Sequence, residues 1–229
     1  MKFQKDTLKG QRTTAVRLKN ARKLTNNSQR WLMRQLNDPY VQQAQKEGLR
    51  SRAAYKLQQL DDKFHFLKKG TRVVDLGAAP GGWSQIAAAR VDPNLQGNLI
   101  VAIDLLDMIP VPGVTFLQGD FFDESIQHDL KSLLTQPAQV VLSDMAASTT
   151  GHSQTDHLRT TALAEAAFEF ARTVLSPGGT FVTKVFQGGA DHDLLQSLKE
   201  NFKDIKHIKP LASRKESPEM YVLAFGFKG

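Results

Sequence analysis

Four aspartates lie at or near the ends of four short β-rich runs of the sequence, and their carboxylates are the first candidates for chemistry. The runs read VVDL, IVAID, FLQGD and VVLSD, and the aspartates are Asp75, Asp104, Asp120 and Asp144. Taken singly, such an aspartate is more often a helix cap or a loop acid. Ligands of parallel α/β sheets bind at the carboxyl ends of the strands, so four carboxylates in this position indicate a binding site.

The aspartates differ in what they could bind. Asp104 lies 27 residues after Gly77, where nucleotide-binding sheets hold the two hydroxyls of a ribose. Asp120, one strand further on, is placed to meet an adenine. Asp75 precedes the glycines of the next segment, which suits a ligand that carries positive charge rather than a diphosphate.

Residues 77–82, GAAPGG, form a loop almost without side chains between a predicted strand and a predicted helix at 83–91. A turn needs one or two glycines, so this composition predicts that something approaches the backbone closely. The loop and the helix start offer N–H groups to a ligand. The segment fits neither G-x-x-x-x-G-K-[ST] nor G-x-G-x-x-G, which argues against a P-loop and a dinucleotide site.

The elements that must position these residues alternate along the chain. Short β-rich runs predict strands, and helical patterns follow most of them, including 157–175, which is predicted to stop at 176–179, and 191–202. Such alternation predicts an α/β fold with parallel strands and right-handed crossovers. The predicted strands are 72–76, 99–103, 113–117, 139–143, 180–186, 204–210 and 219–227.

Composition narrows the class of protein. The chain has 229 residues, 41% of them hydrophobic, which suits one α/β domain with a short appendage. It has no cysteine, which excludes disulfides, thiolate metal sites and cysteine nucleophiles. No apolar run reaches 18 residues and the N-terminus has no apolar core, so we expect a cytoplasmic protein without a membrane partner. His152, His157 and His192 lack metal-ligand spacing, and we expect no metal.

Positive charge is concentrated at the N-terminus. Residues 1–34 hold ten of the 30 basic residues and one of the 23 acidic ones, so the remaining chain, with 20 basic and 22 acidic residues, is slightly negative. We predict a basic, partly flexible arm at 1–34 and a domain at 35–229. The arm is either a solubilising tail or a polyanion-binding segment. The candidate phosphate-binding residues are Arg12, Arg17, Lys19, Arg22, Lys23 and Arg30.

Several segments together resemble the FtsJ (RrmJ) family of S-adenosylmethionine-dependent ribose 2′-O-methyltransferases, over about residues 30–227. The resemblance implies a Rossmann-like, seven-stranded methyltransferase fold with helices on both faces, strand order 3-2-1-4-5-7-6 and strand 7 antiparallel. It also implies transfer to a uridine in the A-loop of 23S ribosomal RNA, in the assembled large (50S) subunit. The segments are NDPYVQQAQKEGLRSRAAYKL, VVDLGAAPGGWSQ, FLQGDF, VVLSDMA, LSPGGTFVTKVFQG and SRKESPEMY.

Site residues can be carried over position by position. The cofactor contacts of the family fall on Gly81, Trp83, Asp104, Asp120 and Asp144, and its catalytic set falls on Lys56, Asp144, Lys184 and Glu219. The strand order supports a common location, because Asp144 and Lys184 close adjacent parallel strands and Glu219 opens an antiparallel one. Lys56, on the helix before the first strand, is the least constrained.

A ribose hydroxyl must lose its proton as it accepts a methyl group, so the reaction needs a base within hydrogen-bonding reach. We assign Lys184 as the base, which requires its neutral form. Asp144 and Glu219 would orient Lys184, and Lys56 would position the hydroxyl or a neighbouring phosphate.

Other functions fit less well. Pyrimidine C5 transfer usually needs a cysteine, and transfer to an exocyclic amine usually shows an N/D-P-P-Y/F motif where this chain has Ser143-Asp144-Met145-Ala146. A nicotinamide-dependent oxidoreductase should prefer G-x-G-x-x-G. Methylation of another RNA, such as tRNA, and a non-catalytic role in ribosome assembly remain open. We expect a monomer.

Overall fold

The computed structural model describes residues 25–92, 99–147, 150–187 and 192–229. The chain divides into two compact units, Met1–Arg52 and Ala53–Gly229. The first unit contains α1 (Asn26–Leu36), which spans the predicted boundary between residues 34 and 35. That boundary between arm and domain stays a prediction.

The second helix of the first unit, α2 (Pro39–Glu47), has clear start and stop signals. Asp38 caps it, because its carboxylate accepts a hydrogen bond of 3.0 Å from the N–H of Tyr40, and Pro39 follows as the first helical residue. Gly48 ends the helix at φ 70°, a left-handed conformation that glycine adopts without strain.

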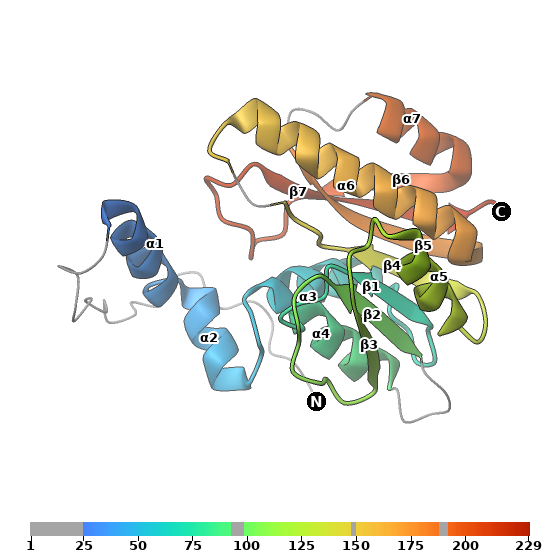
Figure 1. Ribbon diagram of the computed structural model, residues 1–229, viewed down its shortest axis with the longest axis horizontal. Helices are drawn as coiled ribbons and strands as arrows, with labels where there is room; N and C mark the ends of the chain where they lie inside the picture. Colours follow the sequence, from blue (N-terminus) through green and yellow to red (C-terminus); the bar gives the residue numbers. More distant parts are fainter. Residues whose placement is uncertain (1–24, 93–98, 148–149, 188–191) are drawn as a thin grey trace. The chain divides into compact units, whose positions relative to one another are not determined.

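The second unit is built on one seven-stranded sheet, whose order is β3-β2-β1-β4-β5-β7-β6. All neighbouring strands are parallel except those that pair with β7, which is antiparallel to both β5 and β6. The fold and strand order that the sequence analysis expected are therefore confirmed (Figure 1). The strands are β1 (Val73–Leu76), β2 (Ile100–Asp104), β3 (Val114–Gln118), β4 (Ala138–Ser143), β5 (Leu175–Phe186), β6 (Phe202–Ile208) and β7 (Glu219–Phe227).

Helices cover both faces of the sheet (Figure 1). On one face, α5 (Glu124–Ser132), α6 (Ser153–Val174) and α7 (His192–Asn201) bury apolar side chains against alternate strand residues such as Val74, Val141 and Phe181. The other face carries α3 (Ala53–Phe64) and α4 (Gly82–Val91). Strand side chains alternate between faces, so Asp75, Lys184 and Tyr221 point to the α3 and α4 side.

Two elements start four or more residues before their predicted first residue, while the other bounds differ by at most two residues. Helix α6 starts at Ser153 rather than 157, and β5 starts at Leu175, so residues 176–179 lie inside the strand rather than in a turn before it. The register explains this difference: Ala138 pairs with Leu175 and Val140 pairs with Thr180, which leaves extra residues on β5. The Ser-Pro-Gly-Gly sequence forms this irregularity, with Gly178 at φ 83°.

The backbone of the glycine-rich loop after β1 is approached closely by another segment of the chain. A Cβ atom on Gly77 would lie 2.8 Å from the N and Cα atoms of Met145, and Gly77 has φ 78°. The N–H of Asp144 donates to the carbonyl of Leu76 over 3.1 Å, which holds the two strand ends together. The close approach at Gly77 is therefore made by the segment that follows β4, a segment that also carries Asp144.

No helix in the described ranges combines the length and apolar character that a membrane crossing requires.

Candidate active site

Lys184 and Asp144 form the centre of a polar cluster at the carboxyl ends of β4 and β5. The Nζ atom of Lys184 donates to the backbone carbonyl of Asp144 over 2.7 Å and to its Oδ1 over 3.1 Å. Only 6% of Lys184 is exposed, so its ammonium group depends on these two acceptors.

Tyr221 joins this pair from β7 and was missed by the sequence analysis. It is the register partner of Lys184 and is fully buried. Its hydroxyl donates to Asp144 Oδ1 over 2.8 Å and lies 3.2 Å from Glu219 Oε1. The signal was available, because residues two apart on a strand share a face, so Tyr221 must accompany Glu219.

Lys56 and Glu219 complete the cluster. Lys56 Nζ lies 2.6 Å from Glu219 Oε1 and 3.2 Å from the Tyr221 hydroxyl, while Ser213 donates to the same Glu219 oxygen over 3.0 Å. The structure thus brings together all four residues assigned to catalysis, from one helix and the ends of three strands. Their catalytic roles stay predictions.

The cluster holds two lysines and two carboxylates. These charges shift the pKa values of Asp144 and Tyr221. Burial alone would raise the pKa of Asp144, but the ammonium groups of Lys184 and Lys56 and the hydrogen bond from Tyr221 outweigh burial and lower it. Burial and the carboxylates of Asp144 and Glu219 raise the pKa of Tyr221 well above its ordinary value. Asp144 therefore stays ionised, and Tyr221 stays a neutral donor.

Asp104 lies at the end of β2 and ties the glycine-rich loop to the sheet. Its Oδ2 accepts from the N–H of Ala79 and its Oδ1 from that of Leu106, both over 2.8 Å. The N–H groups of Gly77 and Ala78 also donate to the carbonyl of Ile103. Asp104 is therefore part of the loop framework as well as a candidate ligand for a ribose.

The other predicted cofactor residues are placed differently. Asp120 is exposed after β3, and its Oδ1 accepts from the N–H of Phe122 over 3.0 Å. Trp83 is 3% exposed, donates from Nε1 to Ala53 and packs 5.5 Å from the Tyr221 ring, so its indole is part of the core. Gly81 precedes α4 as its N-cap and has no side chain to cap it, so the N–H groups of the first turn, including that of Trp83, can serve a ligand.

The burial and the pKa of Asp75 bear on the expectation that this end of the sheet binds a cationic ligand. It is fully buried, its Oδ2 accepts from Ser84 over 2.6 Å, and its Oδ1 has no hydrogen-bond partner among the described residues. Burial, together with the negative charges of Asp144 and Asp104, raises the pKa of Asp75 to about 7. Asp104 at the end of β2 and Asp120 after β3 add two further carboxyl groups, and such a group of acids fits a ligand with positive charge and hydroxyl groups.

Most of the predicted RNA-binding residues lie in the part of the chain that the structure does not describe. Arg12, Arg17, Lys19, Arg22 and Lys23 lie outside the described residues, and only the backbone of Arg30 is described, within α1.

The histidines play no part in the cluster. His152 precedes α6 and makes no side-chain cap, and His192 lies 3.8 Å from Asp193, with both side chains exposed. Within the described part of the chain, no three His, Asp or Glu side chains are grouped so that they could hold a metal ion.

Comparisons with known proteins point in one direction. Residues 49–227 match the family model of FtsJ-like methyltransferases. The chain is 57% identical over 227 residues to ribosomal RNA large subunit methyltransferase E of Parvibaculum lavamentivorans, covering 96% of this chain and 89% of the relative. The enzyme of the same name from Rhodopseudomonas palustris (strain BisB5) is 58% identical over 226 residues, covering 98% and 94% of the two chains.

A solved structure agrees with the sequence relatives. A crystal structure described as that of a ribosomal RNA methyltransferase from Plasmodium falciparum superimposes with a TM-score of 0.70 at 33% identity. The match covers 79% of this chain and 99% of that chain. The likeness therefore extends over nearly the whole of the solved protein.

Proposed function

Because this chain belongs to the FtsJ-like methyltransferase family, we propose that it transfers a methyl group from S-adenosylmethionine to the 2′-hydroxyl of a uridine in the A-loop of 23S ribosomal RNA. The relatives are named as methyltransferases of large-subunit ribosomal RNA, which supports this class of substrate. The observation that carries the proposal is the hydrogen-bonded cluster of Lys56, Asp144, Lys184, Tyr221 and Glu219, which offers a proton acceptor held by oriented partners.

The glycine-loop end of the sheet fits S-adenosylmethionine, which is cationic and carries a ribose. We assign Asp104 to the ribose hydroxyls, Asp120 to the adenine, and the backbone at Gly81 and Trp83 to the amino-acid part, with Asp144 at the boundary with the catalytic cluster. When bound, the cofactor would supply an electrophilic methyl group.

Lys184 is the proposed base for the ribose hydroxyl. Its neighbours are poorer candidates, because Tyr221 holds its proton more tightly than an ordinary tyrosine and the lowered pKa of Asp144 makes that carboxylate a weak base. Lys184 can accept a proton only in its neutral form, and its two contacts to Asp144 keep Nζ at a fixed place in either state.

Lys56, Glu219 and Tyr221 are proposed to position the acceptor. Lys56 Nζ is held by Glu219, so its positive charge can meet a hydroxyl or a phosphate of the RNA without losing its orientation. Tyr221 contacts Asp144, Glu219 and Lys56, and therefore couples the two ion pairs.

The protein is proposed to be a monomeric cytoplasmic enzyme with a basic arm at residues 1–34 and a domain at 35–229. Its substrate would be an RNA within the large subunit. The arm would add non-specific affinity for this RNA. The net charge of that domain is too low to attract RNA strongly. Deletion of residues 1–24, which leaves α1 whole, should weaken RNA binding, reduce the slope of log affinity against log salt, and leave cofactor affinity unchanged. An unchanged slope would show that the arm does not bind RNA and would favour its interpretation as a solubilising tail.

Mapping the product tests the proposed reaction. Purified large subunits from a strain that lacks the enzyme are incubated with the protein and methyl-labelled S-adenosylmethionine, and their RNA is digested to nucleosides. We expect the label in 2′-O-methyluridine, in one fragment of 23S RNA. Label in a modified base, label only when tRNA is supplied, or no transfer would contradict the proposal, and the last result would favour a non-catalytic assembly role.

A further inference from the structure

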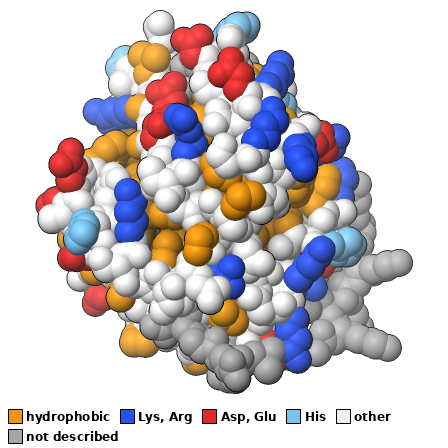
Figure 2. Space-filling model, turned by 90° about the vertical axis from the view of Figure 1, so that its right-hand side faces the viewer, with side chains coloured by type: hydrophobic (Ala, Val, Ile, Leu, Met, Phe, Trp, Pro, Cys, Tyr) orange, Lys and Arg blue, Asp and Glu red, His pale blue; other side chains and the backbone are white. Residues whose placement is uncertain are grey.

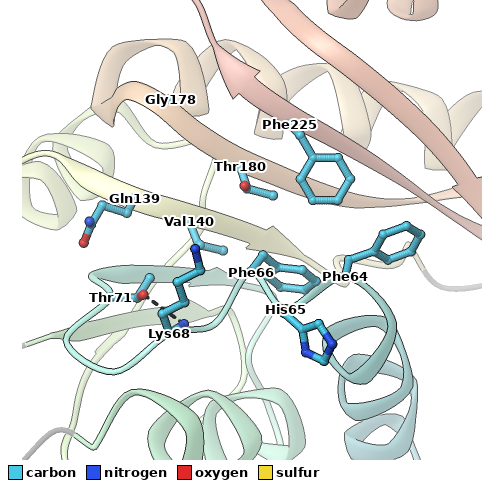
Figure 3. Close-up of a pocket in the computed structure, with 10 residues that line it drawn as sticks. All are labelled: Phe64, His65, Phe66, Lys68, Thr71, Gln139, Val140, Gly178, Thr180 and Phe225. Carbon is cyan, nitrogen blue, oxygen red and sulfur yellow. Dashed lines mark hydrogen bonds between the residues drawn. The ribbon is translucent and has the colours of Figure 1, made fainter.

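A hollow of about 290 Å³ lies at the amino edge of the sheet, away from the catalytic cluster. It is lined by the end of α3 and the segment after it, together with residues of β4, β5 and β7 (Figure 3). Val140 and Thr180 lie four residues before Asp144 and Lys184 on their strands, and Phe225 lies four residues after Tyr221 on the antiparallel β7. The hollow is therefore on the same face as the catalytic cluster but at the opposite edge.

The lining combines aromatic rings with one cation. The rings belong to Phe64, Phe66 and Phe225, and the Phe64 and Phe225 rings lie 5.5 Å apart at an angle of 44°. Lys68 extends between these rings and Gln139 (Figure 3). None of the lining residues is acidic, so an anion meets no opposing carboxylate in the lining itself.

The surrounding segment is strongly basic. Residues 63–72, KFHFLKKGTR, hold four Lys or Arg residues and His65 without an acid. Lys63 Nζ lies over the Phe64 ring at 5.3 Å, Arg72 donates to a backbone carbonyl, and Lys69 forms one exposed contact of 3.8 Å with Asp92. These contacts neutralise little of the positive charge.

The wider surface is mixed in charge. Figure 2 shows the right-hand side of the molecule in Figure 1, where the chain ends after β7, and Lys and Arg side chains are spread there among apolar and acidic ones. Phe66 is buried, but Phe64 and Phe225 are only half-buried. Basic side chains beside aromatic rings that a base can reach are typical of surfaces that bind single-stranded nucleic acid.

We infer that this hollow binds an unstacked nucleotide of the substrate RNA, at a point distinct from the methylated one. The base would stack on the rings of Phe64 or Phe225, and its phosphate would contact Lys68. Stacking accepts any base, so the site would add affinity without sequence choice. The inference rests on the proposed function, because it takes RNA as the substrate.

The distance between the two sites suits one folded RNA. Four residues along β4 or β5 correspond to about 13 Å, and the eight residues from Lys56 to Phe64 along α3 correspond to about 12 Å. Helix α3 therefore carries a catalytic lysine near one end and an aromatic wall of the hollow at the other. An RNA that contacts both ends of α3 would be oriented as well as held.

Photocrosslinking tests the location directly. The full-length protein is irradiated with a short 4-thiouridine oligonucleotide and with 4-thiouridine-substituted large subunits, and is then digested with trypsin. We expect crosslinked nucleotide on the peptide of residues 64–68, FHFLK, which lies between two cleavage sites. Crosslinks found only at the carboxyl edge or in the basic arm would overturn the inference.

Substitutions measure the contribution to affinity. The double variant Phe64→Leu with Lys68→Glu should bind the oligonucleotide about tenfold more weakly than the parent, and its salt slope should fall by about one. Lys199→Glu, the same charge change at an exposed position on α7, is the control and should keep parental affinity. Thermal unfolding and cofactor affinity of both variants show whether the fold is intact.

The two proposals fail in different ways. If the parent methylates ribosomal RNA while the double variant keeps its oligonucleotide affinity, the hollow is not an RNA site and the proposed function stands. If the parent binds and crosslinks at 64–68 but transfers no methyl group, the hollow is an RNA site and the proposed reaction fails.

Discussion

Two aspartates on neighbouring strands, Asp75 on β1 and Asp144 after β4, have pKa values displaced in opposite directions. Asp75 is fully buried and Asp144 is half-buried, but Asp144 lies against two lysines and a tyrosine hydroxyl, which lower its pKa. Asp75 has one serine donor and an unpartnered oxygen among the described residues, and its pKa rises to about 7. Neighbouring positions in one sheet therefore hold one carboxyl group that stays ionised and one that is about half protonated near neutral pH.

The difference separates the site into two halves. The half proposed for catalysis, around β4, β5 and β7, supplies its own positive charges, and its side chains hold one another through hydrogen bonds and ion pairs. In the half proposed to bind the cofactor, around β1 to β3, the carboxylates of Asp104 and Asp120 accept hydrogen bonds from backbone N–H groups of nearby loops. We infer that the first half is preorganised for transfer, whereas the second lacks the positive charge that a cationic cofactor brings.

The largest effect is expected in the catalytic half. Lys184→Ala removes the proposed base and should reduce the single-turnover rate of methyl transfer by about 10²–10⁴, because the group acts mainly in the transition state. Cofactor and RNA should still bind, as shown by calorimetry and filter binding. Lys206→Ala, at an exposed position on β6, is the control. A large loss of cofactor affinity in Lys184→Ala would show that the halves are not separate.

Asp75 should dominate the pH dependence of stability in the cofactor half. The folded protein keeps its proton up to a pKa of about 7, against 3.8 in the unfolded chain, so its contribution to stability decreases as pH rises from about 4 to about 7. Asp75→Asn should remove this decrease. Urea unfolding should show the variant gaining up to about 4 kcal/mol on the parent over that range.

An exposed substitution controls for the loss of a carboxyl group. Asp129→Asn, on the surface of α5, should follow the parent at every pH. If Asp75→Asn also follows the parent, the carboxyl group of Asp75 is ionised in the folded protein and the contrast with Asp144 disappears.

Asp104→Ala should act on cofactor binding alone. Loss of a charge-assisted contact to the ribose should weaken binding of S-adenosylmethionine by about 1.5–3 kcal/mol in calorimetry, with RNA affinity unchanged. Asp107→Ala, three residues further along, is the control. Asp104 also holds the loop at Ala79, so the substitution could weaken cofactor binding through the loop alone.

A cofactor analogue without the 2′-hydroxyl separates the two causes. If parent and variant prefer S-adenosylmethionine to this analogue by the same factor, Asp104 does not contact the ribose.

Tyr221→Phe should have the smallest effect, because it removes one hydroxyl while both ion pairs remain. We expect the transfer rate to fall about tenfold with little change in cofactor affinity, since Asp144 loses one hydrogen-bond donor. Tyr55→Phe, a buried position on α3, is the matched control. A parental rate in Tyr221→Phe would show that the two ion pairs work independently.

The strand order and the edge at which the site lies could be predicted from the sequence. Alternating elements and the family motifs place Asp144 and Lys184 at the ends of adjacent parallel strands, and the antiparallel direction of β7 brings Glu219 to the same edge. The period of two along β7 also places Tyr221 beside Glu219, but the sequence analysis did not use it.

Other features depend on contacts between distant segments. The loop at Gly77, which has almost no side chains, predicts a close neighbour. The identity of this neighbour, Met145, follows only from the pairing of β1 with β4. The position of Lys56 depends on how α3 packs over β7. The start of β5 was missed because a Ser-Pro-Gly-Gly segment is typical of a turn, whereas here it continues the strand through an irregular register.

The central claim, that Lys184 takes the proton of the hydroxyl, is tested most directly by comparing Lys184→Arg with Lys184→Ala. Arginine keeps the positive charge but cannot be deprotonated in proteins. Single-turnover transfer to large subunits is measured across pH with saturating cofactor. The account predicts that the Arg variant is nearly as inactive as the Ala variant at every pH. Substantial transfer by the Arg variant would contradict it and would assign Lys184 the role of an orienting cation.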